Sequence, residues 1–75
     1  MPTQMYKQYG KRTYTIRVAP NGVSGWRAVA SVGHMEGGVF FTDFSKITGL
    51  SGYSADDAWV RAEAQVLTFI DKIDS

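Results

Sequence analysis

The chain has 75 residues, a formal net charge of +1, one histidine and no cysteine. Its length fits a single domain, because domains usually contain about 50 to 250 residues. The lack of cysteine excludes a disulfide framework, a thiolate zinc site and a thiol nucleophile. A small domain without disulfides predicts a cytoplasmic protein. No apolar run approaches the roughly 20 residues that span a membrane, so we expect no membrane partner.

Charge is distributed unevenly along the chain. Every acidic residue follows residue 35, whereas five of the eight basic residues precede it: Lys7, Lys11, Arg12, Arg17 and Arg27. The first half is therefore basic and the second half mildly acidic. Chance together with helix capping explains this pattern as well as a basic binding surface does.

The first ten residues lack the regular pattern that begins at Arg12. Residues 1–10 show no clean period and no apolar core of a signal peptide, so we expect a flexible N-terminal segment before one domain over residues 11–75. From Arg12 the chain alternates, which predicts a strand. One face carries Tyr14, Ile16 and Val18, and the other carries Thr13, Thr15 and Arg17. The turn signal Pro20-Asn21-Gly22 ends this strand, because Asn-Gly supplies positive φ angles.

Two more strands are predicted from the same alternation. The second covers residues 26–32, with Trp26, Ala28, Ala30 and Val32 on one face and Arg27, Val29 and Ser31 on the other. The glycine-rich residues 33–38 predict a turn. The third strand covers residues 39–44, and a loop is predicted over residues 45–53 because it contains two glycines.

A helix is predicted from Ala55 to about Ile73. Ser54 is a suitable N-cap, because its hydroxyl can accept the Asp57 N–H, and Asp57 stands where a capping box places its acid. The core face is one broad apolar stripe: Ala58, Trp59, Ala62, Val66, Phe69, Ile70 and Ile73. Since Ala58 and Ala62 are small, the first half of the helix is expected to lie close to the sheet.

These elements predict an α+β fold, in which a three-stranded antiparallel meander packs against one C-terminal helix. The helix must cover the face that carries Tyr14, Ile16 and Val18. The opposite, outer face of the sheet then has no cover from the domain. As an alternative, residues 1–10 fold back and cover it with Met5, Tyr6 and Tyr9.

Two surfaces are candidates for interaction. The outer sheet face is predicted to present a patch of Arg17, Arg27, Val29 and Phe41. The pattern leaves open whether Phe40 or Phe41 faces outward, and Phe41 is preferred because Phe40 and Phe44 together would bury more area against the helix. On the helix, Val60, Ala64 and Leu67 form a second apolar line, which predicts pairing between two copies. The alternative is an ordinary solvent-exposed helix face.

No residue set has the arrangement of a catalytic or metal site. His34 and Glu36 stand in a glycine-rich turn without a nucleophile or a second ligand. Asp56 and Asp57 are explained by the start of the helix. The segment Gly49-Leu50-Ser51-Gly52 lacks the lysine of a P-loop. The sequence therefore predicts no enzyme, no cofactor and no metal ion.

The helix carries a resemblance to a known family. Gly52-Tyr53-Ser54-Ala55-Asp56-Asp57-Ala58, then Ala62, then Phe69-Ile70-Asp71, resembles the closing segment of HicB-like antitoxin domains. The order of three strands and a helix, with Gly25-Trp26-Arg27-Ala28 in the second strand, is similar to small uncharacterised bacterial proteins. The resemblance implies a non-catalytic bacterial module that binds a protein partner.

Two functions are open at this point. The first is a protein-interaction module that self-associates as a homodimer. The alternative is a nucleic-acid-binding domain that uses the outer sheet face, with arginines on phosphates and an aromatic ring on bases. A sequence pI near 8.1 disfavours the nucleic-acid interpretation, because such domains usually have a pI above about 9.

Overall fold

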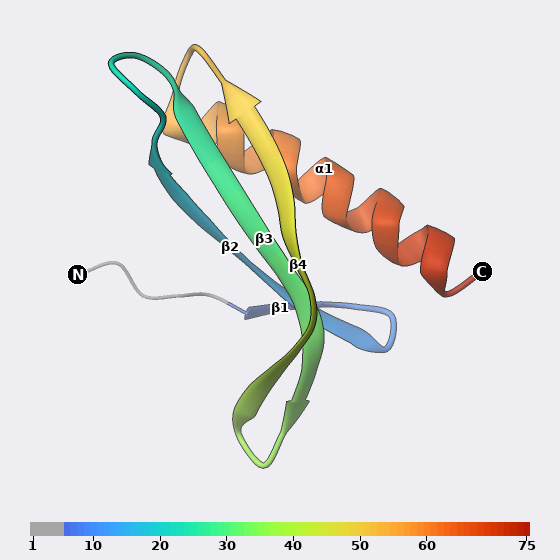
Figure 1. The fold of residues 1–75 in the computed structure, drawn as a ribbon. Helices are drawn as coiled ribbons and strands as arrows, with labels where there is room; N and C mark the ends of the chain where they lie inside the picture. The colour runs from blue at the N-terminus through green and yellow to red at the C-terminus, as the bar shows by residue number, and fades with distance from the viewer. Residues whose placement is uncertain (1–5) are drawn as a thin grey trace.

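The sheet has four antiparallel strands in the order β1-β2-β3-β4, and one helix lies along one of its faces (Figure 1). The computed structural model describes residues 6–75. Its elements are β1 (Tyr6–Tyr9), β2 (Arg12–Pro20), β3 (Trp26–Glu36), β4 (Val39–Ser51) and α1 (Ala55–Ile73). The α+β class, the meander order and the C-terminal helix are confirmed.

Strand β1 corrects the predicted strand count from three to four. It pairs antiparallel with β2, from Tyr6 opposite Thr15 to Tyr9 opposite Arg12. The turn between the two strands contains Gly10 at a φ of +62°, a conformation that glycine adopts without steric cost. A strand of four residues is too short to show a clear alternation. For residues 1–5, the expected flexibility lies outside the described residues.

Strands β3 and β4 are both longer than predicted. β3 continues to Glu36, and the turn after it contains only Gly37 and Gly38, at φ angles of +60° and +80°. β4 continues to Ser51 instead of ending at Phe44. Most of the predicted loop after Phe44 is therefore strand, which lengthens the sheet at the end where the helix begins.

A bulge in β4 explains why its second half was not recognised. Ile47 lies opposite Ala30 and Phe44 lies opposite Val32, so three steps along β4 match two steps along β3. Within the bulge, Lys46 takes a left-handed φ of +67°. The extra residue breaks the period of two on which strand prediction depends.

Gly49 lies in β4 because the helix backbone packs directly on it. A Cβ atom at this position would stand 2.5 Å from the Ala62 N and 2.9 Å from the Ala58 O. Ala58 and Ala62 are fully buried together with Ala28 of β3. The predicted close approach of the first half of the helix is confirmed. The glycine that indicated a loop is instead a packing residue.

The larger half of the core lies under the second half of α1. Cross-strand pairing sets Tyr14 opposite Val32 on the inner face. The buried cluster there consists of Tyr14, Ala30, Val32, Val66 and Ile70. Phe44 extends it with an edge contact to the Phe69 ring, 5.0 Å between centroids. The inner face of β2 and β3 is the one that the alternation predicted.

Two serines hold the start of α1. Ser54 is the N-cap, and its hydroxyl accepts the Asp57 N–H at 3.0 Å, as predicted. The Asp57 carboxylate turns to other partners: it accepts the Ser51 hydroxyl at 2.6 Å and the Arg61 guanidinium at 2.8 Å. These two hydrogen bonds lower the pKa of Asp57 from its ordinary value. The expected capping box is thus replaced by a link between the helix and the end of β4.

Candidate functional site

Strand alternation carries three residues of the predicted patch to the outer face, away from α1. Arg17 lies opposite Val29, and Ala19 lies opposite Arg27. Arg17, Val29 and Arg27 are therefore neighbours, and they line one cavity of about 280 Å³. The structure brings these three residues together as the sequence predicted.

Phe41, the fourth residue of the predicted patch, does not lie on the outer face. Its ring is on the helix side of the sheet, where it stacks on His34 with 5.5 Å between centroids. Phe40 faces outward instead, and its ring lies 5.1 Å from that of Tyr6. The choice of Phe41 over Phe40 was therefore wrong.

A second irregularity in β4 is the physical reason for this error. Phe44 lies opposite Val32, whereas Thr42 lies opposite Gly33, the very next residue of β3. One extra residue on β4 reverses the alternation at this step. Phe44 therefore faces the helix while Thr42 and Phe40 face outward, although a regular strand would place all three on one face.

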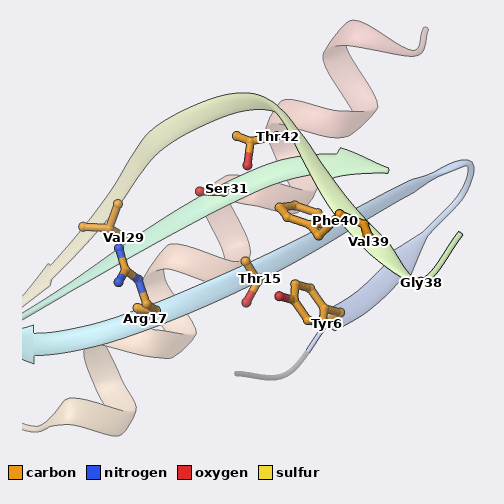
Figure 2. Close-up of a pocket in the computed structure, with 9 residues that line it drawn as sticks. All are labelled: Tyr6, Thr15, Arg17, Val29, Ser31, Gly38, Val39, Phe40 and Thr42. Carbon is orange, nitrogen blue, oxygen red and sulfur yellow. The ribbon is translucent and has the colours of Figure 1, made fainter. Parts of the chain in front are cut away.

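A trough of about 510 Å³ lies on the outer face (Figure 2). The Tyr6 and Phe40 rings close one end, and Arg17 and Val29 lie at the other. Since Tyr6 belongs to β1 and Phe40 to β4, the two edge strands, their rings meet over the inner strands. We call this feature the outer trough; it is lined by Tyr6, Thr15, Arg17, Val29, Ser31, Gly38, Val39, Phe40 and Thr42.

The arginines of the outer face are unpaired. Within residues 6–75, the side chains of Arg17 and Arg27 have no ion-pair or hydrogen-bond partner. On the helix side, three cations are neutralised by carboxylates: Lys7 by Glu63, Arg12 by Asp74 and Arg61 by Asp57. Lys46 and Lys72, which line the groove beside α1, have no ion pair within residues 6–75. The outer face therefore keeps two guanidinium groups whose donors are available to a ligand.

Among residues 6–75, the side-chain carboxylates lie in α1 or on the helix side of the sheet. Four of the seven lie in α1, and Asp74 caps its C-terminus. The remaining two, Glu36 and Asp43, contact His34 on the helix side of the sheet. The charge asymmetry of the sequence thus becomes an asymmetry between two faces, and the described charged side chains of the outer face, Arg17 and Arg27, are positive.

The residues of the predicted apolar line on α1 differ in exposure. Val60 is 59% exposed, but Leu67 is half-buried and packs against the core cluster. Ala64 lines a groove of about 530 Å³ that separates α1 from β4, with Lys46 and Lys72 among its other lining residues. Val60 and Ala64 are exposed, whereas Leu67 is only partly exposed.

Two side chains of β1 reach the flank of α1 that carries Leu67. Leu67 lies one helical turn from both Glu63 and Asp71. Glu63 accepts the Lys7 ammonium at 3.3 Å, and Asp71 accepts the Tyr9 hydroxyl at 2.8 Å. The strand that the sequence did not predict is therefore tied to this flank of the helix by two side-chain contacts.

His34 forms part of a charged cluster at the end of the β3–β4 hairpin. Its Nδ1 lies 3.2 Å from the Asp43 carboxylate, and its Nε2 lies 3.3 Å from that of Glu36. Asp43 also lies 4.0 Å from Arg12, which forms a close pair with Asp74. Among residues 6–75, no group of histidine and carboxylate side chains is arranged to hold a metal ion. The contacts instead link the hairpin, β2 and the end of α1.

The predicted patch did not include Tyr6 or Phe40, and both were considered for the outer face only as alternatives. Gly10 was the one signal for β1, since a glycine in the left-handed region often joins two strands. Among the described residues, the alternative in which the N-terminal segment covers the outer face holds for Tyr6 but not for Tyr9, and Met5 lies outside the described residues. Tyr9 lies on the helix side, where its hydrogen bond to Asp71 raises its pKa.

Comparison with known proteins identifies no family for the chain. No protein-family model, no curated protein and no solved structure matches the chain. The resemblance to HicB-like antitoxin domains therefore stays a prediction. In the part of the chain that the structure describes, no helix has the length and apolar character needed to cross a membrane.

Proposed function

We propose that the protein is a non-catalytic module that binds nucleic acid through the outer face of its sheet. The observation that carries the proposal is the pair of unpaired arginines, Arg17 and Arg27, on a face without carboxylates. The same face ends in the Tyr6–Phe40 ring pair. Cationic and aromatic side chains on one surface are the combination that binds phosphates and bases.

The positions of the arginines suit a phosphate backbone. Arg17 and Arg27 are diagonal neighbours on β2 and β3, a relation that sets their backbones about 7–8 Å apart. A guanidinium binds phosphate oxygens through two parallel N–H donors. Hydroxyls such as those of Ser31 and Thr42, which line the outer trough, commonly contact phosphate and sugar.

Self-association through the same face is a less favourable use of it. In a two-fold dimer the same patch of both copies meets itself. Arg17 and Arg27 of each copy would then enter an interface that has no carboxylate to pair them, and buried unpaired charge is costly. The self-association predicted from the sequence needs another surface, such as the exposed side of α1 around Val60.

The test is a fluorescence-anisotropy titration of labelled oligonucleotides over a series of salt concentrations. The double variant R17Q/R27Q is compared with K46Q/K72Q, which removes the same charge from the groove beside α1. We expect R17Q/R27Q to flatten the dependence of log affinity on log salt by about 1.4, because each phosphate contact on a single strand contributes about 0.7. K46Q/K72Q should leave that slope unchanged.

Two results would contradict the proposal. Equal loss of affinity in both double variants would show that net charge, and not the outer face, attracts the oligonucleotide. Absence of salt-dependent binding by the unaltered protein would remove nucleic acid as the ligand and favour an acidic protein partner for the same arginines.

A further inference from the structure

We infer that the outer trough takes one unpaired base, with a neighbouring phosphate on Arg17, so that the module binds single-stranded nucleic acid in preference to duplex. The inference rests on the proposed function and specifies its ligand. It follows from the size of the trough, from the rings that close its end and from the width of the sheet.

The outer trough is large enough to hold one base. Its volume is about 510 Å³, within the range of about 300–1,000 Å³ that small organic ligands occupy. A base that remains paired and stacked in a helix cannot enter such a space, because its edge alone is accessible from the groove. Only a base released from its partner presents its whole ring to the lining.

The four-stranded sheet is also poorly shaped for duplex readout. The major groove of B-DNA is about 12 Å wide and admits a helix or a two-stranded ribbon. Beside β1, which pairs with Arg12–Thr15 of β2, four strands spaced by about 4.8 Å measure about 14 Å between the axes of the outer two, before side chains are added. The Tyr6 and Phe40 rings, which meet over the inner strands, further prevent β2 and β3 from entering a groove as a ribbon.

The ring pair provides the stacking surface. Tyr6 and Phe40 are tilted by 37° and therefore do not fully cover each other, and Tyr6 keeps 46% of its surface exposed. Figure 2 shows both rings at the end of the trough, with the Thr15 and Ser31 side chains between them and Arg17. If a base stacked on these rings, the sugar–phosphate backbone attached to it would lie over β2 and β3. Its phosphate would then point towards the Arg17 guanidinium.

The chain offers a matched pair of variants to test this arrangement. Phe40 and Phe41 are adjacent in β4 but lie on opposite faces, as their partners Tyr6 and His34 show. F40L and F41L therefore make the same chemical change on the two sides of the sheet. Y6L provides a second probe of the ring pair in a short edge strand that contributes less to the core.

The experiment titrates each variant with a single-stranded oligonucleotide and with a hairpin duplex of the same sequence, after thermal unfolding has shown that each variant folds. Base–aromatic stacking predicts that F40L and Y6L weaken binding of the single strand by about fivefold to a hundredfold. F41L should bind as the unaltered protein does. A fluorescent adenine analogue in the single strand should be quenched on binding, and less so with F40L.

The outcomes separate this inference from the proposed function. Duplex binding as tight as single-strand binding, with F40L and Y6L unchanged, would overturn the inference and leave nucleic-acid binding in place. Equal effects of F40L and F41L would also overturn it, since they would indicate general destabilisation. Failure of both probes to bind would overturn the inference together with the proposed function.

Discussion

The close approach of α1 to β4 predicts that replacing Gly49 even by alanine destabilises the fold. An added Cβ would stand 2.5 Å from the Ala62 N and 2.9 Å from the Ala58 O. Both atoms belong to the helix backbone, which cannot move aside as the end of a flexible side chain can. The helix would have to shift away from the sheet, and the buried contact of Ala28 with Ala58 and Ala62 would loosen.

The size of the effect follows from two opposing contributions. Forcing an extra carbon into a packed core costs about 1–3 kcal/mol. Replacing glycine by alanine also restricts the unfolded chain, which stabilises the folded state by about 0.4–1 kcal/mol. We therefore expect Gly49→Ala to lower the free energy of unfolding by about 1–2 kcal/mol, which for a domain of this length lowers Tm by roughly 4–16 °C.

Thermal unfolding followed by circular dichroism measures this change, and Gly52→Ala is the control. A Cβ at Gly52 meets no atom within 4 Å, and Gly52 does not have a positive φ. Gly52→Ala should therefore leave Tm unchanged or raise it slightly. If Gly49→Ala unfolds at the same temperature as the unaltered protein, the packing argument for Gly49 is refuted.

Two further predictions concern the hydroxyl groups of the core and the helix start. Burial and the 2.6 Å hydrogen bond to Glu63 raise the pKa of Tyr14, so its contribution to stability is complete below the unfolded-state pKa of about 10 and is lost as pH rises above it. Tyr14→Phe should reduce this alkaline loss in urea unfolding measured between about pH 8 and pH 11, and an unchanged profile would contradict it. Ser54→Ala removes the N-cap bond to the Asp57 N–H and should cost about 1 kcal/mol, whereas Ser54→Asn should retain most of it. Equal urea midpoints for these two Ser54 variants would refute the capping role.

Regular segments of the fold were predictable from the sequence, and irregular ones were not. The helix and β2 keep their period over many residues and have clear end signals, so Ser54 and Pro20 marked their boundaries well. β1 has only four residues, and its pairing depends on β2, which is a tertiary effect that a local pattern does not contain. In β4, Gly49 indicated a loop because glycine is common in loops, although here it is required by the helix that packs against it.

The same distinction applies to the candidate site. Arg17, Arg27 and Val29 lie on the regular β2–β3 ladder, where alternation alone places them on the outer face. Phe40 and Phe41 lie beside a bulge, and one extra residue in β4 exchanged their faces. The unpaired state of the arginines was not visible in the sequence, because it depends on how the fold distributes the carboxylates.

The most direct test of the outer-face assignment is a map of backbone amide shifts during titration with a short single-stranded oligonucleotide at low and at high salt. The account predicts salt-sensitive shifts at Arg17, Val29 and Phe40, with little change along the exposed side of α1 around Val60. Shifts concentrated on α1, or an unchanged spectrum at low salt, would contradict the assignment of the outer face as a nucleic-acid-binding surface.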